Sequence, residues 1–115
     1  MPLIPFVNQS GKFHKNFISI KSRGRLFVSK GIRKKLGGGK NEEIKIYLAY
    51  DPVRRCIGIM PAEHAKMENG VPFTLDKDGN CHIIGFIKQF GLPHDKLYRY
   101  ILIGEEEGWL LFKRI

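Results

Sequence analysis

The sequence predicts a mainly β protein with two short helices, built from two successive β-β-α-β-β units. The 115 residues are 43% hydrophobic and rich in isoleucine, phenylalanine and tyrosine, which favour strands. Short alternating runs of apolar and polar side chains are separated by turns that contain glycine, proline or aspartate. The order of these runs in residues 17–62 recurs in residues 72–113. We therefore expect a single compact domain over residues 1–115, whose residues 1–16 form an N-terminal arm.

The first unit is expected to contain four strands and one helix. Its strands are predicted at residues 17–21, 25–28, 44–50 and 56–60. Gly24 suits a turn that needs a positive φ, and residues 51–55 predict a hairpin connection. Ser29 is expected to cap a short helix that ends at the glycines beginning with Gly37. Pro61 is expected to end the fourth strand.

The second unit repeats this order. Its strands are predicted at residues 73–75, 81–84, 98–103 and 109–112, with a helix at 85–90. The side chain of Asp76 is expected to accept hydrogen bonds from backbone N–H groups of its own turn. Glu105–Glu107 are expected to form a hairpin tip. An offset of 55 residues places Gly24 on Gly79. Losing one residue in the helix then places Ile46 on Tyr100, so the resemblance between the halves is one of pattern rather than identity.

Positive charge is concentrated in the first half of the chain. The net charge is +9, from 20 Lys plus Arg and 11 Asp plus Glu. Residues 1–62 contain 13 basic and three acidic side chains and carry +10, whereas residues 63–115 contain seven and eight and carry −1. This asymmetry predicts one side of the molecule that faces a polyanion and a near-neutral second half.

The segment from Gly24 to Gly37, with sequence GRLFVSKGIRKKLG, resembles the AbrB/MazE-like swapped-hairpin (SpoVT-AbrB-type) family. The resemblance covers residues 17–60. It implies that 17–62 is a basic AbrB-like unit and that 72–113 is a second unit fused to it. It also implies a swapped-hairpin β-barrel, closed within one chain, that binds DNA through basic residues of the first hairpin and helix.

The chain departs from the family pattern at several positions. Ser29 stands where the family usually has proline, and Gly31 where it often has an acidic residue. The family's basic pair in the first strand falls on Ile18 and Ser19. Residue by residue, the resemblance carries DNA contact to Arg25, Arg33 and Lys34 only.

Six cations form the predicted DNA-contact face. They are Lys21, Arg23, Arg25, Lys30, Arg33 and Lys34. Those of the hairpin alternate around its turn, and those of the helix lie opposite Ile32 and Leu36. Because the two elements are consecutive, we expect them to lie close together. The leading prediction is therefore a non-enzymatic DNA-binding protein, a small transcriptional regulator, with Arg23 and Arg25 as candidates for base readout.

Two other partners remain open at this point. A protein-binding module, antitoxin-like or an inhibitor of a nucleic-acid-processing enzyme, would present the same basic face to an acidic partner or nucleoprotein complex. The aromatic residues near the C-terminus, such as Trp109 and Tyr98, favour core packing, with a protein-binding patch as the sharper alternative. RNA binding is a third possibility, although the sequence contains no recognisable exposed-aromatic RNA motif.

Other chemistry finds little support in the sequence. The glycine run before Lys40 follows a helix and lacks the serine or threonine of a nucleotide-binding loop. Cys56, Cys81 and the four histidines lack metal-ligand spacing, so we expect no metal, no cofactor and no catalytic residues. Without a recognisable signal peptide or membrane span, we expect a cytoplasmic protein that makes no membrane contact. The barrel would form as a monomer or a homodimer.

Overall fold

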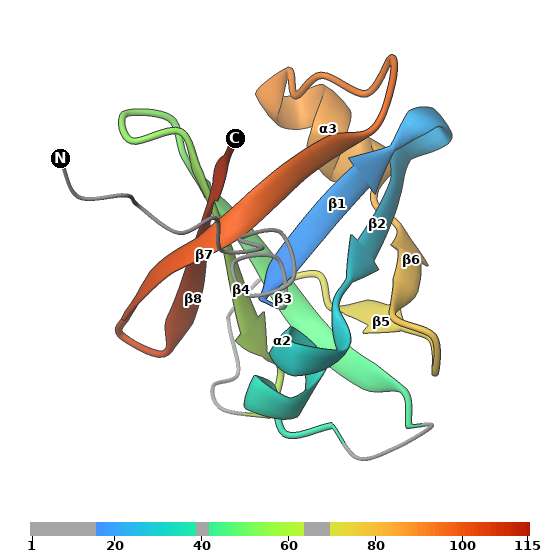
Figure 1. The fold of residues 1–115 in the computed structure, drawn as a ribbon, viewed down its shortest axis with the longest axis vertical. Helices are drawn as coiled ribbons and strands as arrows, with labels where there is room; N and C mark the ends of the chain where they lie inside the picture. Colours follow the sequence, from blue (N-terminus) through green and yellow to red (C-terminus); the bar gives the residue numbers. More distant parts are fainter. Residues whose placement is uncertain (1–15, 39–41, 64–69) are drawn as a thin grey trace, which may run out of the picture.

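The computed structural model describes residues 16–38, 42–63 and 70–115. Eight strands form one antiparallel sheet in this part of the chain, and two α-helices accompany them (Figure 1). The strands are β1 (Phe17–Lys21), β2 (Arg25–Val28), β3 (Ile44–Asp51), β4 (Cys56–Pro61), β5 (Phe73–Leu75), β6 (Asn80–His82), β7 (Tyr98–Glu106) and β8 (Trp109–Arg114). The helices are a 3-10 turn η1 (Ser22–Gly24), α2 (Lys30–Lys35) and α3 (Ile84–Phe90). The mainly β class with two short helices is confirmed; the expected N-terminal arm, apart from Asn16, lies outside the described residues.

The sheet nearly closes on itself to form a barrel. Its strand order is β5-β3-β4-β8-β7-β1-β2-β6, with antiparallel pairing between neighbours. The two end strands, β5 and β6, contact each other, and the Asp76 N–H donates to the Asn80 carbonyl at 2.9 Å across their connection. Pairs of strands from the two halves of the chain alternate around the barrel, because β1 pairs with β7 and β3 pairs with β5.

The core follows from the alternation of side chains along the strands. In β1, Ile18 and Ile20 are fully buried, and Leu26 and Val28 face them from β2. The remaining fully or almost fully buried apolar side chains come from all parts of the barrel and both helices, and they include Ile32, Leu36, Ile46, Ile57, Ile59, Leu75, Ile83, Ile87 and Phe112. One continuous core therefore joins the two halves of the chain.

Two glycine turns bring the halves into direct backbone contact. Gly24 and Gly79 have φ values of +75° and +87°. The Ile83 N–H donates to the Gly24 carbonyl, and the Val28 N–H donates to the Gly79 carbonyl, each at 2.8 Å. A Cβ on Gly79 would lie 2.5 Å from the Val28 carbonyl oxygen, so only glycine fits this approach.

Three local predictions need correction. Ser29 precedes α2, but its side chain makes no cap hydrogen bond; instead its Oγ accepts from the Phe17 N–H at 3.1 Å and fixes the start of β1. Strand β6 ends at His82 rather than at Ile84, which is the first residue of α3, whereas β4 ends at Pro61 as expected. Strand β7 continues through Glu106, past a register shift between Leu102 and Gly104. The acidic run is thus mostly strand, because pairing with β8 outweighs the turn preference of its glycine.

Candidate nucleic-acid interface

The β1–β2 hairpin presents three cations at its turn. Lys21 and Arg25 are paired across the two strands and exposed, and Arg23 is exposed between them in η1. The backbone of Arg23 is left-handed, with φ 69°. A non-glycine residue in this conformation costs about 1–2 kcal/mol, so the hairpin retains an arginine where glycine would be less strained. These three residues, Lys21, Arg23 and Arg25, are called the hairpin cations below.

Aromatic rings extend the hairpin cations along the outer face of the sheet. The Lys21 ammonium lies 5.3 Å from the Phe27 ring centroid. Phe27 in turn packs against Phe17 with the ring centroids 5.9 Å apart, and the Arg99 guanidinium lies 4.6 Å from the Phe17 centroid. Two cations therefore flank a pair of packed aromatic rings across β2, β1 and β7. Sequence reasoning missed Phe17, Phe27 and Arg99, because their neighbourhood depends on the pairing of β1 with β7.

Helix α2 presents the other predicted cations. Lys30 and Lys34 are exposed, whereas Ile32 is fully buried beneath them. Arg33 is only partly exposed: its Nη1 donates to the Lys77 backbone carbonyl at 2.8 Å, and its Nε is buried with no hydrogen-bond partner among the described residues. Arg33 thus holds the turn that follows β5, and its guanidinium is turned toward the second half of the chain.

The two groups of cations lie at opposite ends of β2. The hairpin turn packs against α3, where a Cβ on Gly24 would come within 2.8 Å of the Ile84 Cβ. Helix α2 begins only after β2 has run back from that turn, and it lies near the start of β1 (Figure 1). The expected single face of six neighbouring cations is therefore divided. Consecutive elements lie apart here because a strand separates them along its length.

The acidic turn between β5 and β6 is linked to both groups of cations, to Arg25 by charge and to Arg33 by a hydrogen bond. Asp76 Oδ1 accepts from the N–H groups of Asp78 and Asn80, both at 2.9 Å. This confirms the prediction that the Asp76 side chain is hydrogen-bonded within its own turn. These hydrogen bonds, led by that from Asn80, lower the pKa of Asp76, and the charge of Arg25 lowers it further. Asp76 thus lies within electrostatic reach of Arg25, one of the hairpin cations, whereas Arg33 of α2 contacts the same turn through the Lys77 carbonyl. The hairpin turn itself contains no acidic residue.

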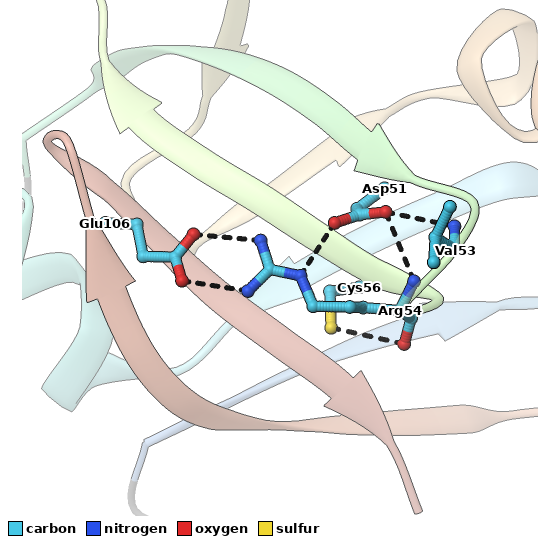
Figure 2. Close-up of polar contacts among 5 residues, drawn as sticks. All are labelled: Asp51, Val53, Arg54, Cys56 and Glu106. Carbon is cyan, nitrogen blue, oxygen red and sulfur yellow. Dashed lines mark hydrogen bonds and ion pairs between the residues drawn. The ribbon is translucent and has the colours of Figure 1, made fainter.

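Another arginine, Arg54 of the β3–β4 hairpin, is paired with carboxylates, so its charge is neutralised. Figure 2 shows the Arg54 guanidinium held between Asp51 and Glu106. Its Nη1 and Nη2 each donate to Glu106 at 2.8 Å, and its Nε donates to Asp51 at 2.7 Å. Hydrogen bonds from Arg54 lower the pKa of both carboxyl groups. Arg54 therefore ties the tip of one hairpin to the tip of the β7–β8 hairpin.

Residues considered for other chemistry are placed apart from one another. Cys56 is buried and Cys81 half-buried, both as free thiols, and burial raises the pKa of the Cys81 thiol to about 12. Among the described residues, no group of three or more His, Cys, Asp or Glu side chains is arranged to hold a metal ion. His14 and His64 lie outside the described residues, as does Lys40 of the glycine run.

The C-terminal aromatic residues are distributed between core and surface. Tyr100 and Phe112 are buried in the core. Phe90 packs against Phe86 and Tyr50, with ring centroids 5.0 and 5.3 Å away. Trp109 is half-buried and covers Gly58, whose Cβ position lies 3.1 Å from the indole ring. These described aromatic side chains thus contribute mainly to packing within and across the sheet.

Comparison of the chain with protein-family models, with curated proteins and with solved structures finds no match. None of the described helices has the length and apolar character needed to cross a membrane.

Proposed function

We propose that this chain is a non-enzymatic DNA-binding protein, a small transcriptional regulator, that contacts duplex DNA first through the hairpin cations. The observation that carries the proposal is the hairpin turn itself. Three exposed cations stand on it without an acidic neighbour in the turn, and the central one, Arg23, occupies a strained backbone position. Strain kept at an exposed charged residue favours a role for its side chain over a role in folding.

The strand pairing supports a swapped-hairpin barrel of two fused AbrB-like units. Exchanging the first four strands with the last four leaves the strand order unchanged once β5 and β6 are counted as neighbours. The registers follow the same exchange. Ile20 pairs with Tyr98, and the equivalent positions under the sequence offsets, Leu75 and Ile44, also pair. Two interlocked halves of one chain would thus take the place of the family's two subunits.

The division of the cations assigns them different roles in the proposed complex. Arg23 and Arg25 are long, forked and exposed, which suits them to bidentate contact with guanine edges in a major groove. Lys21, Lys30 and Lys34 are exposed point charges, suited to phosphates that position the protein. Arg33 supports the interface indirectly, because it is hydrogen-bonded to Lys77.

A salt titration of duplex binding tests this proposal. Fluorescence anisotropy would follow the whole chain binding to an unphosphorylated duplex of about 20 base pairs at several salt concentrations. On a duplex of arbitrary sequence, which lacks a specific site for Arg23 and Arg25 to read, all five exposed cations of the predicted contact face meet phosphates and predict a log–log slope of about −4.5. The Arg23→Gln/Arg25→Gln variant should lose about 1.8 of that slope, at about 0.9 per phosphate contact.

A matched control separates a defined interface from general attraction. Lys45→Gln/Lys96→Gln also removes two positive charges, but from exposed positions outside the hairpin turn. Its affinity for the duplex should stay within about twofold of that of the unmodified chain. Equal losses in the two variants, or an affinity independent of salt, would contradict the proposal. If the chain does not bind the duplex and a protein partner stays bound after nuclease treatment, the protein-binding alternative is favoured. Tighter binding to RNA than to duplex DNA would favour an RNA-binding protein.

A further inference from the structure

A second group of cations, separate from the hairpin cations and from α2, lines a recess in the surface. A surface recess of about 420 Å³ opens between the end of α3 and strands β3, β7 and β8. Three cations line it, Arg55, Lys113 and Arg114, together with Tyr50 and Tyr100. These five residues define what we call the basic recess. Its volume lies within the range of about 300–1,000 Å³ that is typical of small-molecule sites.

The positive charge of the basic recess is not neutralised locally. No carboxylate occurs among the described residues that line it. Asp51 is paired with Arg54 at 2.7 Å, and the charged Asp95, which accepts from the Tyr98 hydroxyl at 2.6 Å, does not line the recess. The Arg114 guanidinium lies 5.4 Å from the Tyr98 ring centroid, so an aromatic face rather than an anion supports it.

The walls of the basic recess are fixed by the fold. Tyr100 is 2% exposed and belongs to the core, and Tyr50 is held against Phe90. Gly91 ends α3 in a left-handed conformation, and the Leu92 N–H donates back to the Ile87 carbonyl at 3.0 Å. Largely pre-formed walls of aromatic and apolar residues with a few charged groups are typical of small-molecule sites.

A recess elsewhere in the barrel provides an internal comparison. It has a volume of about 370 Å³ and lies beside the end of α2, as the basic recess lies beside the end of α3. Its charged lining residues are Lys35 and Glu105, one of each sign. Similar hollows at the ends of the two helices therefore differ in charge, which means that the barrel architecture alone does not account for three cations in one of them.

We propose that the basic recess binds the phosphate group of a phosphate monoester. Two arginines offer planar forks that match phosphate oxygens, and Lys113 adds a point charge. A phosphate monoester carries about −1.5 to −2 at pH 7 and offsets most of the three positive charges, whereas a carboxylate offsets only one. Tyr50, with Leu92 and Pro93 beside it, provides a surface for the body that carries the phosphate.

Binding of two defined probes to the whole chain tests this inference. Isothermal titration would use inorganic phosphate and adenosine monophosphate, and amide NMR shifts would locate the site. We expect saturable binding with shifts centred on Arg55, Gly91 and Leu92. The Arg55→Gln/Arg114→Gln variant should bind at least about tenfold more weakly, and Lys35→Gln, at the comparison recess, should bind like the unmodified chain.

Further arms distinguish the source of the phosphate. Stronger binding of a 5′-phosphorylated single strand than of its unphosphorylated copy would assign the recess to a nucleic-acid end; preference for adenosine monophosphate would assign it to a free metabolite. Both outcomes support a phosphate site. No saturable binding of any probe up to about 10 mM, which corresponds to less than about 3 kcal/mol, would overturn it. Duplex binding with unphosphorylated ends reports separately on the hairpin cations, so either proposal can fail alone.

Discussion

Two glycines carry much of the geometry at the residue scale. The Gly24 and Gly79 carbonyls each accept a backbone hydrogen bond from the opposite half of the chain, and both residues are left-handed. Gly79 also makes room for Arg33, whose Nε would lie 2.9 Å from a Cβ at that position. A single missing side chain thus allows the backbone contact between halves and the path of an arginine from α2.

Replacing Gly79 by alanine should therefore cost more stability than the same change at Gly91. Both residues have positive φ, at +87° and +63°, and both substitutions incur about 1–2 kcal/mol of backbone strain. A Cβ at Gly91 meets nothing within 4 Å, whereas one at Gly79 overlaps the Val28 carbonyl. Urea unfolding of the two variants measures the difference. Equal losses would show that the close backbone approach has no energetic weight.

Among the secondary-structure elements, the hairpin tips contain the residues with positive φ and the ion pairs of Arg54. Arg23, Arg55 and Glu107 are the described non-glycine residues with positive φ, and each occupies the tip of a different hairpin. The β3–β4 and β7–β8 tips are joined through Arg54 and Glu106, whose side chains are about half exposed. Pairs with this exposure contribute little stability. Arg55, the next residue in the chain, lines the basic recess.

The β5–β6 turn should make stability depend on pH through Asp76. Its pKa is lowered in the folded protein, so its contribution is present above the unfolded value near 3.8 and is lost as pH falls through the folded value. Asp76→Asn keeps an acceptor oxygen but removes the charge. The variant should therefore be less stable than the unmodified chain at pH 7, and the gap should narrow below about pH 4.

Chemical unfolding at pH 7 and pH 3 measures that gap. Asp78→Asn in the same turn is the matched control, because both side-chain hydrogen bonds of the turn end on Asp76 and not on Asp78. A gap between Asp76→Asn and the unmodified chain that stays constant from pH 7 to pH 3 would remove Asp76 as the source of the dependence.

At the scale of the whole molecule, the nearly closed barrel forms within one chain. Four pairings join the halves, and they place residues far apart in sequence side by side: β1 with β7, β2 with β6, β3 with β5, and β4 with β8. One core runs through both halves, so neither half buries its apolar face alone. The net charge, by contrast, lies almost entirely in the first half, at +10 against −1 in residues 63–115, and that half carries the proposed DNA contact.

The chain should accordingly be a folded monomer in solution. Light scattering is expected to give the mass of one chain, 13.2 kDa, and the unfolding midpoint should not change on dilution. An obligate dimer whose unfolding midpoint falls with concentration would show that the hairpins pair between chains instead. The measurement thus separates the two oligomeric states that the sequence left open.

Most of the element pattern could be predicted from sequence, because local periodicity and turn residues report local conformation. Alternation identified β1 through β4, and Gly91 marked the end of α3. The errors occurred where tertiary contacts override local preference. Ser29 turns from its helix to the Phe17 N–H, and Glu105 and Glu106 join β7 because β8 offers them partners.

The candidate site divided along the same line. Neighbouring residues are enough to predict that positive charge belongs to the first half and that Lys21 and Arg25 flank a turn containing Arg23. The pairing of the strands was needed to show that α2 lies at the far end of β2, that Arg33 donates to Lys77, and that Arg55 lines one recess with Lys113 and Arg114. Those neighbourhoods arise from strand pairing over long sequence separations, which local chemistry does not encode.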